Sequence, residues 1–64
     1  MTKSVHTKNY TRFLELLITA RKDADVTQDE VARRLNRPQS FVSKYENGER
    51  RVDIIEFIEI AESI

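Results

Sequence analysis

The sequence predicts an all-α fold, a compact arrangement of four short helices, and three observations point to it. A single glycine and a single proline occur among the 64 residues, so few positions interrupt a helix. Apolar residues recur three and four positions apart in four separate segments, which is the periodicity of an amphipathic helix. Two of these segments follow a capping sequence, in which a Thr or Asp precedes a Glu by three residues. A chain of this length forms one domain with one small core.

The first predicted helix begins at Tyr10 and fades after Arg21, where a polar connector follows. Its apolar side chains recur at helical spacing and would form one buried face. They are Tyr10, Phe13, Leu14, Leu17 and Ile18. Residues 1–9 are expected to form a flexible basic tail ahead of a folded domain that spans residues 10–64.

The second and third predicted helices are short. Thr27 is a suitable N-cap for the second helix, and Glu30 closes a capping box with it. A break at Asn36 and Arg37 precedes Pro38, which suits the first position of the third helix because its missing N–H is not needed there. The apolar residues of the two helices are Val31, Ala32 and Leu35, then Phe41, Val42 and Tyr45. The dipeptide at positions 47–48, Asn-Gly, is a typical C-terminal stop.

The fourth predicted helix follows Asp53, which forms a capping box with Glu56. It has more apolar positions than one buried face needs, namely Ile54, Ile55, Phe57, Ile58, Ile60, Ala61 and Ile64. We expect Ile55 and Ile60 to be the surplus, forming an exposed apolar strip. Such a strip suits a homodimer contact or the packing of a further helix.

The formal net charge is zero, but the charges are strongly grouped along the chain. The successive segments 1–12, 13–32, 33–52 and 53–64 carry charges of +3, −3, +4 and −4. A total of zero argues against nucleic-acid binding, because such domains are usually basic. However, the third predicted helix lies within the most basic segment, and the position of a charge group matters more than the sum. The acidic last helix would face away from a nucleic acid.

Composition excludes several classes of function. The chain has no cysteine and one histidine, which excludes a disulfide framework, a cysteine nucleophile and a Cys/His metal cage. The acids of the last helix recur every three residues with no nucleophile near them, so we interpret them as a solvated face and not as an acid–base pair. No apolar run reaches the roughly 18 residues of a membrane span. The sequence therefore predicts a cytoplasmic protein that is not an enzyme, with no cofactor, no metal and no membrane contact.

The segment TQDEVARRLNRPQSFVSKYENGERR, residues 27–51, resembles the helix-turn-helix of the Cro-like phage-repressor (Xre-type) family of DNA-binding proteins. The shared features are Thr-Gln-x-Glu at the start of one helix, Ala four residues after the Gln, a small polar pair opening the next helix, and Glu-x-Gly at its end. With the flanking helices, the resemblance covers residues 10–64. It implies a four-helix, truncated form of the five-helix phage-repressor-like domain. It also implies sequence-specific binding of double-stranded DNA by a transcriptional regulator of repressor type.

Under this resemblance the third helix is the recognition helix, which enters the major groove of DNA. Four polar residues on its outer face are the predicted base contacts, namely Gln39, Ser40, Ser43 and Lys44. Gln pairs well with adenine, Lys with guanine, and Ser with either. The alternative for the same four residues is an ordinary solvated helix face.

The resemblance also implies contacts to the DNA backbone. Gln28 resembles the family's glutamine that contacts a phosphate and supports the first glutamine of the recognition helix, here Gln39. The amides and dipole of a helix N-terminus favour phosphate at that place. The predicted phosphate contacts are Gln28, Asn47, Arg50, Arg51 and Arg37. For Arg37 the alternative is a solubilising charge that contacts no DNA.

Further roles follow from the same resemblance. Arg21 and Glu46 resemble a partly buried structural ion pair that joins the first helix to the end of the recognition helix. Asp25 and Asn36 depart from the family pattern, which often has glycine at these positions. Either the turn is reshaped, or the backbone is left-handed there, which Asp and Asn tolerate better than most residues. Phe41 either meets DNA at an exposed position or packs in part against the core.

Two hypotheses about function follow. The first is DNA binding, in which a single module binds weakly and specific occupancy needs a homodimer on two half-sites about 34 Å apart. The second is a protein-interaction module, such as an antitoxin-like regulatory partner, that uses the isoleucine-rich last helix. The surplus apolar positions and the zero net charge favour the second, and the motif at residues 27–51 favours the first.

Overall fold

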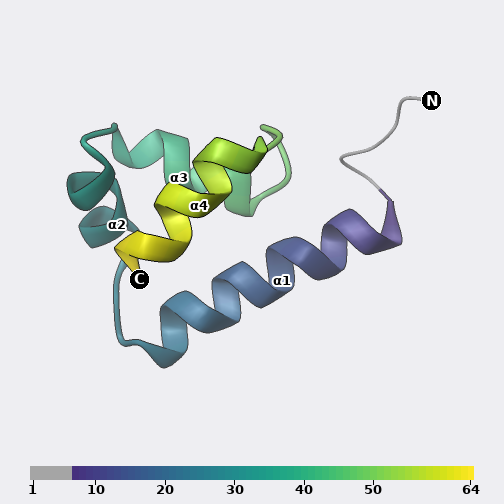
Figure 1. The fold of residues 1–64 in the computed structure, drawn as a ribbon, viewed down its shortest axis with the longest axis horizontal. Helices are drawn as coiled ribbons and strands as arrows, with labels where there is room; N and C mark the ends of the chain where they lie inside the picture. Colours follow the sequence, from purple (N-terminus) through teal and green to yellow (C-terminus); the bar gives the residue numbers. More distant parts are fainter. Residues whose placement is uncertain (1–6) are drawn as a thin grey trace.

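The computed structural model describes residues 7–64 and consists, over that range, of four α-helices (Figure 1). They are α1 (Lys8–Asp23), α2 (Gln28–Leu35), α3 (Gln39–Glu46) and α4 (Ile54–Ser63). The predicted all-α, four-helix fold is confirmed. The long helix α1 runs along one side of the molecule, and the three shorter helices pack together on the other side (Figure 1). Among the described residues, no helix is both long and apolar enough to cross a membrane.

Helix α1 begins two residues before the predicted start. The hydroxyl of Thr7 accepts a hydrogen bond from the backbone N–H of Tyr10 at 3.1 Å, so Thr7 is the N-cap and Lys8 the first helical residue. The predicted boundary of the tail at residue 9 is therefore wrong. The rest of the predicted tail, residues 1–6, lies outside the described residues. At its other end α1 continues past Arg21 and ends at Asp23.

Both predicted capping boxes are present. The Thr27 hydroxyl accepts from the N–H of Glu30 at 3.1 Å, while the Glu30 carboxylate accepts from the N–H of Thr27 at 2.9 Å. Asp53 and Glu56 make the same exchange at 2.8 and 3.1 Å. Pro38 differs from its prediction: it is the N-cap of α3 in extended conformation and not the first helical residue. Its ring offers no capping group, so the start of α3 has no side-chain cap.

Three residues with positive φ make the turns between helices. Asp25 (φ 59°) lies between α1 and α2, Asn36 (φ 58°) ends α2, and Gly48 (φ 81°) follows α3. The first two show that Asp and Asn keep the left-handed backbone in place of the family's glycine, and the third confirms the predicted stop. Because a left-handed residue turns the chain sharply without needing many residues, α2 and α3 are joined by only three residues, 36–38.

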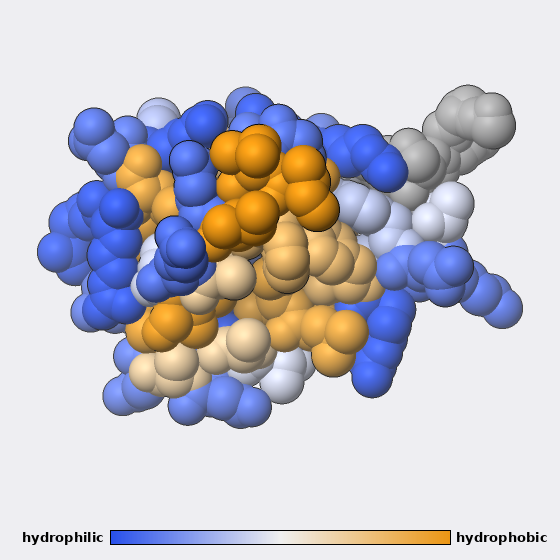
Figure 2. Space-filling view, in the orientation of Figure 1, coloured by the Kyte–Doolittle hydropathy of each residue, from blue (hydrophilic) through white to orange (hydrophobic). Residues whose placement is uncertain are grey.

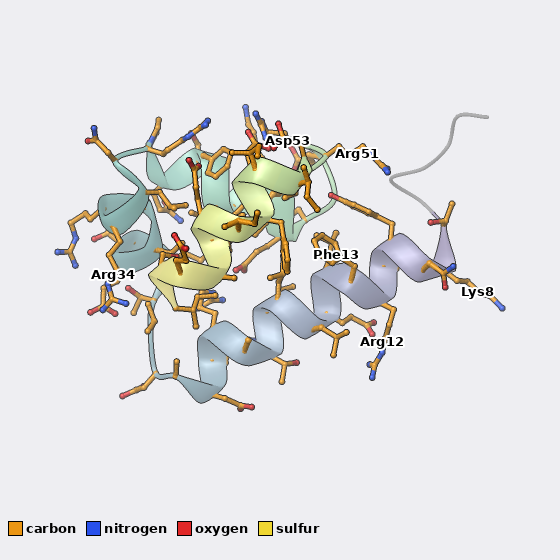
Figure 3. The ribbon with its side chains drawn as sticks, in the orientation of Figure 1. Lys8, Arg12, Phe13, Arg34, Arg51 and Asp53 are labelled. Carbon is orange, nitrogen blue, oxygen red and sulfur yellow. The ribbon has the colours of Figure 1, made fainter. Side chains whose placement is uncertain are left out.

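The core is built from side chains of all four helices and of the turns between them. Val31, Val42, Tyr45 and Ile60 have at most 1% of their surface exposed. Phe13 points from α1 toward α4, and its ring lies 5.5 Å from that of Phe57 (Figure 3). The remaining buried apolar residues are Tyr10, Leu14, Leu17, Val26, Ala32, Phe41 and Val52.

The exposed strip on α4 differs in part from the prediction. Ile55 is exposed, as expected, but Ile60 is completely buried. The face of α4 that carries Ile60 and Phe57 turns inward, and the opposite face carries Ile54, Ile55 and Ile58, whose exposed fractions are 70, 61 and 47%. Figure 2 shows an apolar surface on this side of the molecule. Leu16 of α1 is exposed as well.

We expect Gly48→Ala to lower the free energy of unfolding by about 1 kcal/mol. A left-handed L-residue costs roughly 1–2 kcal/mol, and part of this is offset because alanine stiffens the unfolded chain. A Cβ at this position would lie 3.8 Å from Leu14 Cδ1, an ordinary contact, so the cost comes from the backbone. Urea unfolding measures it. Gly48→Asn is the control, and equal losses for Asn and Ala would contradict the backbone explanation.

Candidate nucleic-acid interface

The outer face of α3 carries the four predicted base contacts. Gln39, Ser40 and Lys44 are exposed and Ser43 is half-buried. The residues between them, Phe41, Val42 and Tyr45, are buried. The helical period thus places one set of side chains in the core and leaves the polar set facing solvent on one surface.

The side chain of Gln39 is held by that of Gln28. Gln39 Nε2 donates a hydrogen bond to Gln28 Oε1 at 2.8 Å, which joins the first residue of α3 to the first residue of α2. Gln28 Nε2 in turn donates to Glu46 Oε1 at 2.8 Å. With one N–H committed to Gln28, the Gln39 amide keeps its oxygen and a second N–H. That pair is the acceptor–donor set that reads the edge of adenine.

Glu46 is the central acceptor of a buried polar network. Arg21 donates to its carboxylate twice, from Nε at 2.7 Å and from Nη2 at 3.1 Å, and also donates from Nη1 to the carbonyl of Val26 at 2.9 Å. The side chains of Arg21 and Glu46 are 11 and 5% exposed. The hydrogen bond to Glu46 raises the pKa of the Arg21 guanidinium above its ordinary value. The ion pair that the family resemblance implies is thus present, and its Glu46 carboxylate also accepts the hydrogen bond from Gln28.

The predicted phosphate contacts fall into two groups. Asn47 and Arg51 are exposed beyond the end of α3, and Gln28 is half-buried at the N-terminus of α2. Arg51 stacks over the ring of Tyr10 at 4.8 Å, near Asp53 at the start of α4 (Figure 3). The second group, Arg37 and Arg50, is bound within the molecule.

Arg37 and Arg50 come from opposite ends of α3 and meet on one aromatic ring. Their guanidinium carbons lie 4.4 and 4.8 Å from the centre of the Phe41 ring. Both also pair with Glu56 of α4, Arg50 at 2.8 Å and Arg37 at 3.6 Å. Phe41 is 8% exposed, so it packs in the core and is covered by cations, which decides between the two sequence interpretations of this residue.

Glu56 is a buried, ion-paired carboxylate next to the predicted phosphate contacts that the sequence analysis did not identify. The prediction of a solvated acidic face is wrong for it, because it is 8% exposed and accepts hydrogen bonds from Arg50 and from the backbone N–H of Asp53. The Arg50 hydrogen bonds, with smaller contributions from the backbone of Asp53 and the charge of Arg37, lower the pKa of Glu56 to about 2. The capping box could have indicated this burial, because a carboxylate that accepts a hydrogen bond from the N-cap N–H also lies near the preceding loop.

The remaining cations of α2 are also engaged within the molecule. Arg34 donates to the carbonyl of Ser63 at 2.7 Å and so ties α2 to the end of α4. Arg33 pairs with Asp29 at 3.3 Å on the surface of α2. Lys44 has no such ion pair within residues 7–64, so it is a charge on α3 that is open to an external anion. Those residues also contain no cluster of acidic, histidine or cysteine side chains suited to a metal ion.

Comparison with known proteins gives two matches. Residues 17–64 match the sequence model of the family described as "Helix-turn-helix". Among solved structures, the chain is similar to one described as "XRE-family like protein from Pseudomonas syringae pv. tomato str. DC3000". The two share 52% sequence identity with a TM-score of 0.89, over 95% of this chain and 74% of that chain. No protein of curated function matches the chain significantly.

We expect the free energy of unfolding of the domain to fall at acidic pH, because the contacts of Glu56 need its carboxylate to be charged. Its folded-state pKa of about 2 lies below the unfolded value of 4.5, so the stabilisation is complete above about pH 4.5 and is lost as the pH falls toward 2. Thermal unfolding across this range measures the loss. Glu56→Gln should be less stable near neutral pH and should lose less stability as the pH falls.

The matched control is Glu59→Gln, which removes an exposed carboxylate from the same helix. Glu30, whose pKa is lowered mainly by its hydrogen bond with the backbone of Thr27, contributes to the slope that remains. If the stability of Glu56→Gln fell as steeply with decreasing pH as that of the wild-type chain, the loss could not be assigned to Glu56.

Proposed function

This chain belongs to the Cro/C1-type (XRE) helix-turn-helix family of DNA-binding regulators, and we propose that it binds double-stranded DNA sequence-specifically as a transcriptional repressor. The observation that carries the proposal is the hydrogen-bonded series Gln39–Gln28–Glu46–Arg21, which ends in the core. A side chain held in this way loses little further freedom when it contacts a base. The family is regulatory and is not normally enzymatic.

In the proposed complex α3 lies in the major groove. Gln39 reads adenine with its free oxygen and N–H, and Lys44, one helical turn further, donates to guanine. Ser40 and Ser43 contact base edges or the adjacent sugar. Such contacts determine which sequence is bound, whereas contacts to phosphate determine where the protein sits on the duplex.

The proposed contacts to the DNA phosphates lie near both ends of α3. Gln28 and the free amides at the start of α2 approach one phosphate, where the helix dipole also favours an anion. Beyond the end of α3, Asn47 and Arg51 approach another, and Arg37 and Arg50 add positive charge beside Phe41. The acids Glu59 and Glu62 lie on α4 and would stay clear of the duplex. A protein with this function would work in the cytoplasm, at the nucleoid.

A single module of this size makes few contacts, so we include a homodimer in the proposal. Two copies on half-sites about 34 Å apart would present two recognition helices to the same side of DNA. The surface that supports the pairing is the apolar strip of Ile54, Ile55 and Ile58, which is exposed in the isolated chain. Exposed apolar patches of this kind mark protein contacts.

The same strip supports the second candidate function, an antitoxin-like module in which another protein covers α4. Both candidates use the same surface of α4, which is covered by a second copy of this chain in the first and by a different protein in the second. A chain that stays monomeric at all concentrations, yet binds DNA, would favour a different protein as the occupant.

We expect Lys44→Ala to relax sequence preference, at a cost of roughly 1–3 kcal/mol for the preferred site. Arg51→Ala should instead weaken all sequences alike and lower the slope of log affinity against log salt by about 1. Selection from a random duplex library, followed by salt titration of each variant, measures both effects. If Lys44→Ala changed neither the selected sequence nor the affinity, the assignment of the base-reading face would be wrong.

For the dimer, Ile55→Glu places a charge on the strip and should abolish the rise in mass with concentration in sedimentation. Asn9→Glu adds the same charge at an exposed position in the first turn of α1 and is the control. A wild-type chain with the mass of one copy throughout, with and without DNA, would overturn the dimer and leave the DNA-binding proposal standing.

A further inference from the structure

Two arginines proposed to approach phosphate are fixed by one carboxylate of α4, a helix to which we assign no DNA contact. Arg37 precedes α3, Arg50 follows it, and Glu56 belongs to the first turn of α4. The carboxylate of Glu56 accepts from Arg50 Nη1 at 2.9 Å and from Arg50 Nη2 at 2.8 Å, with Arg37 Nη2 at 3.6 Å. This is a bidentate pair with a second guanidinium beside it.

Exposure divides the cluster into an inner acid and outer cations. The side chain of Glu56 is 10% exposed, whereas those of Arg37 and Arg50 are each 39% exposed. The Phe41 ring supports both guanidinium groups from the core side. The arrangement therefore turns the remaining N–H groups of the two arginines toward solvent and keeps the carboxylate behind them.

The hydrogen bonds leave both arginines able to bind a further anion. Arg50 has five N–H groups, of which two bond to Glu56 and one to the carbonyl of Arg51. Its unused N–H groups and those of Arg37 can still reach phosphate. However, two cations and one anion within a few ångströms act on a distant phosphate as one net positive charge, because opposite charges so close together largely cancel beyond their own separation.

We propose that Glu56 is a positioning residue for DNA recognition. It fixes Arg37 and Arg50 on the Phe41 ring, where they can contact phosphate once α3 is in the groove, and it removes one unit of the charge that would attract any DNA sequence. Nonspecific affinity depends almost entirely on such charge, whereas specific affinity also depends on base contacts. Glu56 thus weakens nonspecific attraction to DNA while it holds the two arginines in place for the specific complex. This inference rests on the proposed DNA-binding function.

The test is the salt dependence of binding to a short duplex of random sequence. Glu56→Gln should raise nonspecific affinity, by up to roughly eightfold near 0.1 M salt if one more phosphate is neutralised, and should steepen the log–log salt slope by about 0.9. Glu59→Gln is the matched control: it changes the net charge equally on the same helix, and Glu59 pairs with neither arginine in the described part of the chain. It should shift both quantities much less.

A merely structural role for Glu56 predicts the opposite result, weaker binding to every duplex. Two further variants keep the test decisive if Glu56→Gln fails to fold, as judged by its amide NMR spectrum. Arg50→Gln alone should weaken nonspecific binding, and adding Glu56→Gln should restore it toward the wild-type level, because the cluster regains its net positive charge. No restoration, or equal effects of Glu56→Gln and Glu59→Gln, would overturn the inference. A wild-type chain that binds no duplex at low salt would overturn the proposed function as well.

Discussion

The arrangement of the domain depends on one constraint: the carboxylate of Glu46, which is 5% exposed, must be neutralised inside the protein. Arg21 of α1 and Gln28 of α2 meet this need at distances of 2.7–3.1 Å. Removing one partner of a buried ion pair costs roughly 3–5 kcal/mol, because the other charge is left without compensation. Three helices are therefore held in one relation around Glu46. The position of Gln39 follows from it through Gln28.

The carboxylate of Glu56 is also largely buried and must likewise be neutralised, and its position contributes to a surface more basic than the zero net charge suggests. Glu56 lies inward of Arg37 and Arg50, whose side chains are each 39% exposed. Lys44 and Arg51 are exposed nearby. Exposed acids lie on α4, as Glu59 does, but also at the start of α2 and in the loop after α3. At the Glu56 cluster charge is thus separated by depth, which the sum over the sequence cannot reveal.

Sequence reasoning was most accurate where the structure depends on local contacts. The capping boxes at Thr27 and Asp53 involve neighbours three positions apart, so spacing and residue type are sufficient to predict them. The left-handed backbone at Asp25 and Asn36 was suggested by the family resemblance, which places glycine there. The helical period likewise placed Gln39 and Lys44 opposite the buried face of α3.

Contacts between distant elements were harder to predict. The capping box places Glu56 near the preceding loop, but spacing alone does not show that Arg50 in this loop pairs with it. The exposure predicted for Ile60 is wrong because α4 has more apolar positions than one buried face needs, so that only its packing against the other helices decides which face is buried. The predicted roles of the DNA-facing residues remain predictions.

The most direct test of the central claim is an NMR titration of the labelled protein with a short duplex at low and at high salt. The polar face of α3 and the residues that support it should respond together. Shifts should therefore gather on Gln28, on residues 39–44 and on residues 47–51, with the side-chain amides of Gln28 and Gln39 among them, and should fade as salt rises. Shifts confined to α4, or none on α3, would contradict the claim that this face binds DNA.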